Sequence, residues 1–230
     1  MQSKHLASLS IICLLGTVLW LALMIAGLAG AGPLDTFDLM VNHVSQGGTV
    51  FHLTYANAAV LTVMVVMLFA GLYLHYKSAA PFWALAGVIF VPVYGLLNLV
   101  VYLSQITVVP QLLQLSTMPE SQSMALFFLQ QTIQQWPGSA AAVLNNLAYA
   151  VLGIPSIIFG VLMFRERGLT RAGGILLVLN GAACSAGFVG IALQSALLSN
   201  GSMVGGVLFL FALVCMSLGY GAGAWKKKTN

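Results

Sequence analysis

Residues 152–190 read LGIPSIIFGVLMFRERGLTRAGGILLVLNGAACSAGFVG. Two apolar runs are separated here by a short turn that carries Arg165, Arg167 and Arg171. Each run continues to about the 20 residues that an α-helix needs to cross the hydrocarbon core of a membrane. Because backbone groups in lipid must be paired within the chain, this stretch predicts two membrane helices joined by a basic turn.

The composition of the whole chain of 230 residues extends this prediction. Hydrophobic residues make up 60% and charged residues 5%, whereas soluble domains carry about 25% charged residues. The balance excludes a soluble globular protein and an intrinsically disordered one. We predict an all-α, polytopic transmembrane bundle of six helices in a single domain, residues 1–230. The predicted spans are residues 6–31, 53–76, 81–109, 140–164, 172–198 and 203–225.

The first span has a competing interpretation. A basic start followed by an apolar run also resembles a secretory signal peptide, but the run of residues 6–31 is about twice as long as the usual apolar region of roughly 7–15 residues. We therefore expect this segment to be retained as a helix.

The charges predict the orientation of the bundle. With six spans, all 8 Lys and Arg residues fall on one side, and Asp35, Asp38 and Glu120 fall on the other. Basic residues mark the cytoplasmic side, so both termini are expected there, in a bacterial or archaeal plasma membrane. The basic residues sit at helix ends and not on a folded basic face, which argues against nucleic acid as a partner. Those predicted to bind anionic lipid headgroups are Arg165, Arg167, Arg171, Lys226, Lys227 and Lys228.

The second outside loop contains a predicted amphipathic helix at residues 121–135. Leu126, Leu129, Ile133 and Trp136 recur at helical spacing, and Pro137 with Gly138 would end the helix. One interpretation is a lid over an external cavity. The other is a helix resting on the lipid surface with Trp136 at the level of the headgroups.

No Asp, Glu, Lys, Arg or His lies well inside a predicted span. Charged residues within a membrane mark ion sites, proton relays and counter-ions. Their absence argues against carboxylate-coupled transport, a retinal Schiff base and a buried bis-histidine haem, and we predict no cofactor. Asp35, Asp38, His43 and His52 share the first outside loop, but their spacing matches no metal motif, so no metal site is predicted.

The spans carry neutral polar side chains instead. Those of the third span lie 4, 4 and 3 residues apart and share one helix face. The set of candidate residues is Tyr94, Asn98, Tyr102, Gln105, Asn145, Tyr149, Asn180 and Gln194. Because an amide facing lipid would be unpaired, these faces should point inward. They either bond the helices together or line an outward-facing pocket for an uncharged or amphiphilic ligand. Pro92 and Pro155 favour local kinks in the third and fourth spans.

Small residues recur at helical spacing in the last two spans, among them Gly187, Gly190, Gly205 and Gly219. Such residues let helix backbones approach closely in lipid. We expect them to pack neighbouring helices, and a partner subunit is the alternative.

The stretch Leu152–Gly190, with its basic turn and central Asn-Gly, resembles a group of bacterial and archaeal membrane proteins catalogued as a domain of unknown function. The helix that bears Tyr and Asn before a long outside loop fits the same pattern. The resemblance implies a six-helix fold, and it implies no known activity.

Two functions remain open. The first is a non-catalytic structural or accessory membrane subunit that contacts a partner subunit or a second copy of itself. The second is a binder or carrier of a small neutral or amphiphilic ligand, such as a lipid, a quinone or an isoprenoid-like molecule, held between the third, fourth and fifth spans. An enzyme is not expected, because general acid–base catalysis needs His, Glu, Asp or Lys in the site.

Overall fold

The computed structural model of the chain describes residues 2–29 and 31–226. These residues form α-helices and connecting turns, with no β-strand among them. Six helical stretches in this part of the chain are long and apolar enough to cross a membrane. They are α1 (Gln2–Leu28), α3 (Gly48–Tyr76), α4 (Pro81–Val88) continued by α5 (Val91–Ser116), α7 (Ala140–Met163), α8 (Gly168–Ala192) and α10 (Gly201–Lys226). The prediction of an all-α, multi-pass membrane protein with six spans is confirmed.

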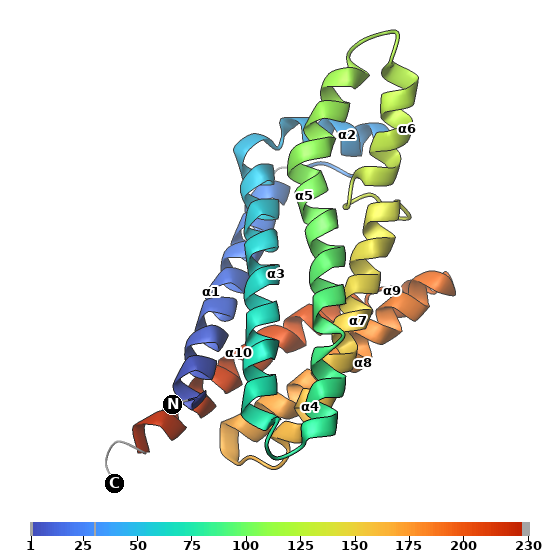
Figure 1. Cartoon of the computed structure of the whole chain (residues 1–230). Helices are drawn as coiled ribbons and strands as arrows, with labels where there is room; N and C mark the ends of the chain where they lie inside the picture. The colour runs from blue at the N-terminus through green and yellow to red at the C-terminus, as the bar shows by residue number, and fades with distance from the viewer. Residues whose placement is uncertain (1, 30, 227–230) are drawn as a thin grey trace.

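The six spans form a closed bundle in which helices that follow one another are antiparallel (Figure 1). The bundle closes because α1 packs against both α3 and α10. Helices α8 and α10 are inclined to α3 and α5. The turn that joins α8 to α10 contains α9 (Ala196–Ser199) and lies nearer to the middle of the bundle than α2 does. The start of α1 and the end of α10 lie at the same end of the bundle.

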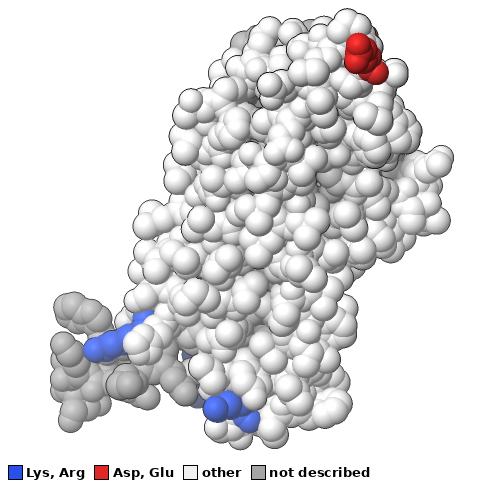
Figure 2. All heavy atoms as spheres, turned by 45° about the horizontal axis from the view of Figure 1, so that its top comes forward, with Lys and Arg blue, Asp and Glu red and all other residues white. Residues whose placement is uncertain are grey.

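The charged residues are divided between the two ends of the bundle. The basic residues of the start of α1, the end of α3 and the α7–α8 turn lie at the end of the bundle where α1 begins, and Figure 2 shows an acidic group at the opposite end. Arg165, Arg167 and Arg171 are exposed there. Lys227 and Lys228, which were predicted to contact headgroups, lie outside the described residues, and so does the side chain of Lys226.

The first outside loop contains a short helix for which no bounds were predicted. Helix α2 (Phe37–Gln46) begins after Thr36, whose hydroxyl oxygen accepts a hydrogen bond from the Leu39 N–H at 3.4 Å. Its Met40 and Val44, four residues apart, are buried. Figure 1 shows α2 lying across the bundle axis over the outer end, as expected of a helix at a membrane surface.

Helix α6 (Gln122–Thr132) is shorter than the predicted helix at residues 121–135 and has a different position. It stands beside the end of α5 as the second arm of a helical hairpin (Figure 1). Leu129 and Ile133 are fully buried in this contact. The helix therefore packs along α5 and does not lie across the end of the bundle as α2 does, because two residues of its apolar stripe are buried in this contact.

The predicted ends of two membrane spans are wrong. The third span was expected to end at residue 109, before Pro110, but α5 continues through that proline to Ser116. The fifth span was expected to reach residue 198, but α8 ends at Ala192, and the chain turns through Gln194 at φ 51°. The expected break near Pro92 is confirmed, because α4 and α5 are separated at Ile89 and Phe90. Helix α7 continues through Pro155.

Backbone contact between α7 and α8 fixes the packing of the inclined helices. A Cβ atom at Gly153 would lie 2.7 Å from the Gly181 carbonyl oxygen, and one at Gly160 would lie 2.6 Å from the Gly174 carbonyl oxygen. The two glycines on each helix lie seven residues apart and let the two backbones come into contact. Small residues are expected at such a contact, because lipid does not drive helices together through the hydrophobic effect. Of the other glycines named from the sequence, Gly187, Gly190, Gly205 and Gly219 each meet the facing segment of the α8–α10 hairpin.

The core has two apolar clusters. The inner cluster joins all six spans and includes Phe69, Phe159 and Met216. The outer cluster joins α2, α3, α5 and the α6–α7 region, and includes Tyr55, Tyr102 and Leu129. The seam between the two clusters crosses α5 between Tyr94 and Val101, and this is where the neutral polar side chains meet.

Candidate functional site

The polar face of α5 points into the bundle, as its spacing requires. Tyr94, Asn98, Tyr102 and Gln105 are all buried, and the side chains of Asn98 and Gln105 have no exposed surface. The face is turned towards α3 on one side and α7 on the other. The structure thus brings the four α5 candidates into one column along the core.

Helix α7 contributes two of the predicted residues to this column. The hydroxyl groups of Tyr102 and Tyr149 are hydrogen-bonded at 2.8 Å, and the rings of Tyr94 and Tyr149 lie 6.2 Å apart between centroids. Asn145, one turn before Tyr149, is buried, and its Oδ1 has no hydrogen-bond partner. We call the residues Tyr94, Asn98, Tyr102, Gln105, Asn145 and Tyr149, together with Tyr55 and Thr62 of α3, the polar column.

The α3 members were missed by the sequence analysis. The Tyr55 ring lies 6.1 Å from the Tyr102 ring, and the Tyr55 hydroxyl donates to Gln134 Oε1 at 2.9 Å. Thr62, two turns further on the same face, donates its hydroxyl hydrogen bond to the Ala58 carbonyl at 2.9 Å. The seven-residue spacing of these two polar residues on α3 was the signal available in the sequence.

The outer end of the column is tied to the segment after α6. Gln105 Nε2 donates to the Thr132 carbonyl at 2.8 Å, and Gln105 Oε1 accepts from the Gln134 N–H at 3.1 Å. One buried amide therefore satisfies two backbone groups at the point where α6 ends. This contact holds residues 132–134 against the outer end of the polar column.

A small cavity lies beside the outer end of the polar column. It has a volume of about 30 Å³, which is enough for a water molecule. Helices α1, α2 and α3 line it together with Gln135, whose buried Oε1 has no hydrogen-bond partner. Tyr55 belongs to both the cavity wall and the polar column, so the two are adjacent.

Two predicted site residues lie elsewhere. Asn180 faces α10, where its Nδ2 donates to the Gly205 carbonyl at 2.9 Å. Gln194 is exposed just beyond the end of α8, because that helix ends earlier than predicted. The fifth predicted span therefore contributes neither of these side chains to the polar column, which is built from α3, α5 and α7.

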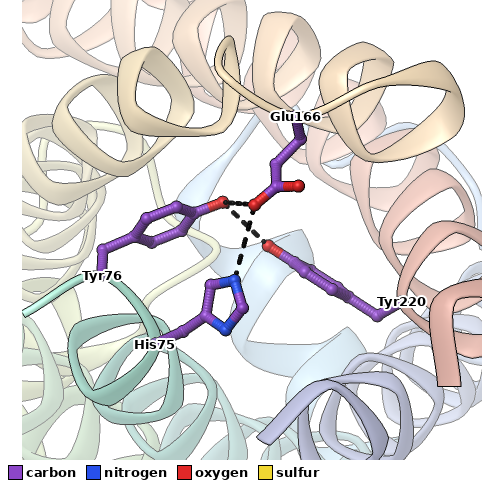
Figure 3. A network of polar contacts seen from close by, with 4 residues as sticks. All are labelled: His75, Tyr76, Glu166 and Tyr220. Atoms are coloured by element: carbon purple, nitrogen blue, oxygen red, sulfur yellow. Dashed lines mark hydrogen bonds and ion pairs between the residues drawn. The ribbon is translucent and has the colours of Figure 1, made fainter. Parts of the chain in front are cut away.

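A second polar cluster lies at the inner end of the bundle, among residues that the sequence analysis did not select (Figure 3). The Tyr76 hydroxyl donates to Glu166 Oε1 at 3.3 Å, and the same Tyr76 hydroxyl lies 3.3 Å from that of Tyr220. His75 Nε2 lies 3.5 Å from Glu166 Oε1. Glu166 therefore joins the end of α3, the α7–α8 turn and α10.

Glu166 is the one acidic residue predicted on the basic side, and its contacts explain that placement. We expect Glu166→Ala to destabilise the protein by about 1–2 kcal/mol, because the Tyr76 hydroxyl loses a charged acceptor that is partly exposed. The thermal unfolding temperature of the purified protein measures this. The exposed Glu120 provides a control with the same loss of charge, and Glu120→Ala should change stability by less than about 0.5 kcal/mol. Equal effects of the two substitutions would contradict a stabilising role for the contacts of Glu166.

Within the described residues, no group of three His, Cys, Asp or Glu side chains is placed to hold a metal ion. His52 of the first outside segment instead lies with its Nδ1 2.8 Å from the Gly48 carbonyl oxygen.

Comparison of the chain with protein-family models, with characterised proteins and with solved structures finds no match. The resemblance of Leu152–Gly190 to uncharacterised membrane proteins therefore stays a prediction.

Proposed function

We propose that this chain is a non-catalytic accessory protein of the bacterial or archaeal plasma membrane, which docks a partner membrane protein through the α5–α6 hairpin. The observation that carries the proposal is the length of the third span. Residues 81–116 form about 54 Å of helix, against the roughly 30 Å of a hydrocarbon core. The hairpin tip stands beyond α2 (Figure 1).

The hairpin carries apolar side chains that the chain itself does not cover. Met124 is 57% exposed and Phe127 is 60% exposed, and Met118 and Phe128 are exposed beside them. Acidic residues lie near this surface, since Glu120 lies in the turn at the hairpin tip and α2, which carries Asp38, lies at the level of α6 (Figure 1). An exposed apolar patch with polar residues at its edge is typical of a protein-binding surface.

The chemistry of the partner follows from the charges. The outer end carries Asp35, Asp38 and Glu120, and no Lys or Arg is present between residues 5 and 76 or between residues 78 and 164. A partner with an apolar surface and a basic residue near Glu120 complements this hairpin. The lack of carboxylate, imidazole or ammonium groups in the polar column supports a non-catalytic role.

The hairpin surface makes a direct prediction. A photocrosslinking residue placed at Phe127 should form a discrete adduct with one membrane protein in native membranes, because this side chain lies on the docking surface. Adding Met124→Asn should reduce that adduct by about tenfold, because a polar side chain weakens an apolar contact by about 1.4 kcal/mol. Mass spectrometry of the crosslinked product measures both.

The control position is Leu96 on α5, which is exposed within the membrane-spanning part and should crosslink to lipid alone. If the residue at Phe127 also captured lipid alone, the hairpin would lie in the bilayer and the docking proposal would fail.

The proposed orientation, with both termini in the cytoplasm, has its own test. The basic end of the bundle supports it through the preference of Lys and Arg for the cytoplasmic side. In intact cells, a membrane-impermeant maleimide should label Ser121→Cys at the hairpin and should leave Ser78→Cys unlabelled until the cells are opened. The three native cysteines are replaced in both variants for this experiment. The reverse labelling pattern would invert the topology.

A further inference from the structure

Asn98 is the most unusual polar residue of the described core. It has no exposed surface, and neither its Nδ2 nor its Oδ1 has a hydrogen-bond partner. It lies at the seam between the two apolar clusters, one helical turn from Tyr94 on one side and from Tyr102 on the other. Burying an amide with neither group paired costs several kcal/mol, so a partner that complements both a donor and an acceptor is expected here.

The neighbouring hydroxyl groups are engaged with one another. The Tyr102 and Tyr149 hydroxyls bond each other, and the Thr62 hydroxyl donates to a backbone carbonyl of its own helix. The Tyr94 hydroxyl group lies close to the side chains of Asn98 and Thr62, but it is not within hydrogen-bond distance of either amide atom of Asn98. The group that satisfies Asn98 is therefore expected to be small, since it must fit between these packed rings.

Other unpaired oxygen atoms lie along the same core. Asn145 Oδ1 and Ser156 Oγ of α7 are buried without hydrogen-bond partners, and so is Gln135 Oε1 at the outer cavity. A water or hydroxyl group suits each of them, because it donates to an amide oxygen and exchanges a hydrogen bond with a serine. Asn145 and Ser156 lie on α7, and Gln135 lies at the outer cavity.

The core on the inner side of Asn98 is apolar and closely packed. The rings of Phe69 and Phe159 lie 5.8 Å apart between centroids, and the inner apolar cluster of all six spans surrounds them. A packed apolar core at this level suits retention of a molecule and does not suit passage across the membrane.

We propose that the core between α3, α5 and α7 is a binding site for the hydroxyl group of a small neutral molecule, either water or an alcohol, anchored on both amide atoms of Asn98 and entered from the outer cavity. The O–H of the ligand donates to Oδ1, and its oxygen accepts from Nδ2. The site excludes charged ligands, because the polar column supplies no charged group to pair with them. This site is separate from the α5–α6 hairpin, so either can fail without the other.

The first test is an experimental density map of the full chain at a resolution that shows ordered water. A peak within hydrogen-bond distance of both amide atoms of Asn98 supports the proposal, and an empty space beside an unpaired amide overturns it. Native mass spectrometry then distinguishes the two sources. A stoichiometric adduct with the mass of an alcohol identifies a hydroxylated ligand, and a density peak without any adduct identifies water.

The second test is the sign of a stability change in Asn98→Thr. Threonine has nearly the volume of asparagine, and in a helix it satisfies its own hydroxyl, as Thr62 does here. If the site is occupied, the unfolding temperature falls by about 5 °C because the ligand is lost. If the site is empty, the temperature rises because an unpaired amide has been removed, and the proposal is overturned.

Asn57→Thr calibrates the second test, because the Asn57 amide donates to the Gly16 carbonyl at 3.0 Å and its removal must lower the unfolding temperature. The buried thiols of Cys13 and Cys184 report unfolding when they react with a fluorescent maleimide. Asn98→Leu provides a second, fully apolar variant in case threonine itself recruits water.

Discussion

Gly181→Ala should destabilise the protein by about 2–3 kcal/mol and lower its unfolding temperature by about 6 °C or more. The added methyl group would collide with the Gly153 carbonyl oxygen on α7, and it would also lie 2.7 Å from a methylene of Ile157. A backbone atom in a packed helix cannot move aside as the end of a side chain can. The two helices must therefore separate or shift along their length.

The matched control is Gly206→Ala on α10. A Cβ atom there meets nothing within 4 Å, and alanine is the better helix former by about 1 kcal/mol. The unfolding temperature of this variant should stay unchanged or rise slightly. Similar losses in both variants would show that general helix propensity, and not the α7–α8 backbone contact, sets the effect.

Gln105→Leu should release the segment between α6 and α7 without unfolding the spans. The substitution leaves the Thr132 carbonyl and the Gln134 N–H without their hydrogen-bond partner, and each unpaired backbone group costs about 1–3 kcal/mol. Amide hydrogen exchange in residues 132–139 should therefore accelerate by about tenfold to a hundredfold. Exchange in α3 and α7 should change little.

Gln130→Leu is the control for this experiment. Gln130 is exposed on α6, so the same change of side chain removes no buried contact. Acceleration of exchange in the segment by both variants would indicate that the polarity of the hairpin holds it in place. An unchanged exchange rate in Gln105→Leu would mean that the two hydrogen bonds of Gln105 contribute little.

The polar column shows how far helical spacing carries a prediction. The α5 residues Tyr94, Asn98, Tyr102 and Gln105 recur on one face, and the structure buries that face. Asn180 met the same criterion on its own helix, but it faces α10. Periodicity identifies the buried face of a helix, whereas the neighbour that covers this face depends on how the helices are arranged.

The helix ends show a related limit. Proline predicted the break before α5 correctly and the end of the third span at Pro110 incorrectly. A proline removes one backbone donor wherever it lies in a helix. Packing then decides the outcome, and α5 continues through Pro110 because α6 pairs with its last turns.

The sequence alone determined the class of the protein, the six spans and the side on which the charges gather. These follow from the cost of placing charges and unpaired backbone groups in lipid, which depends on local composition. Only the tertiary structure brought Tyr55 to the polar column, joined Glu166 to Tyr76 and Tyr220, and left Asn98 without a partner. Those relations join segments far apart in the chain, and the close approach of glycine backbones between α7 and α8 fixes where the segments meet.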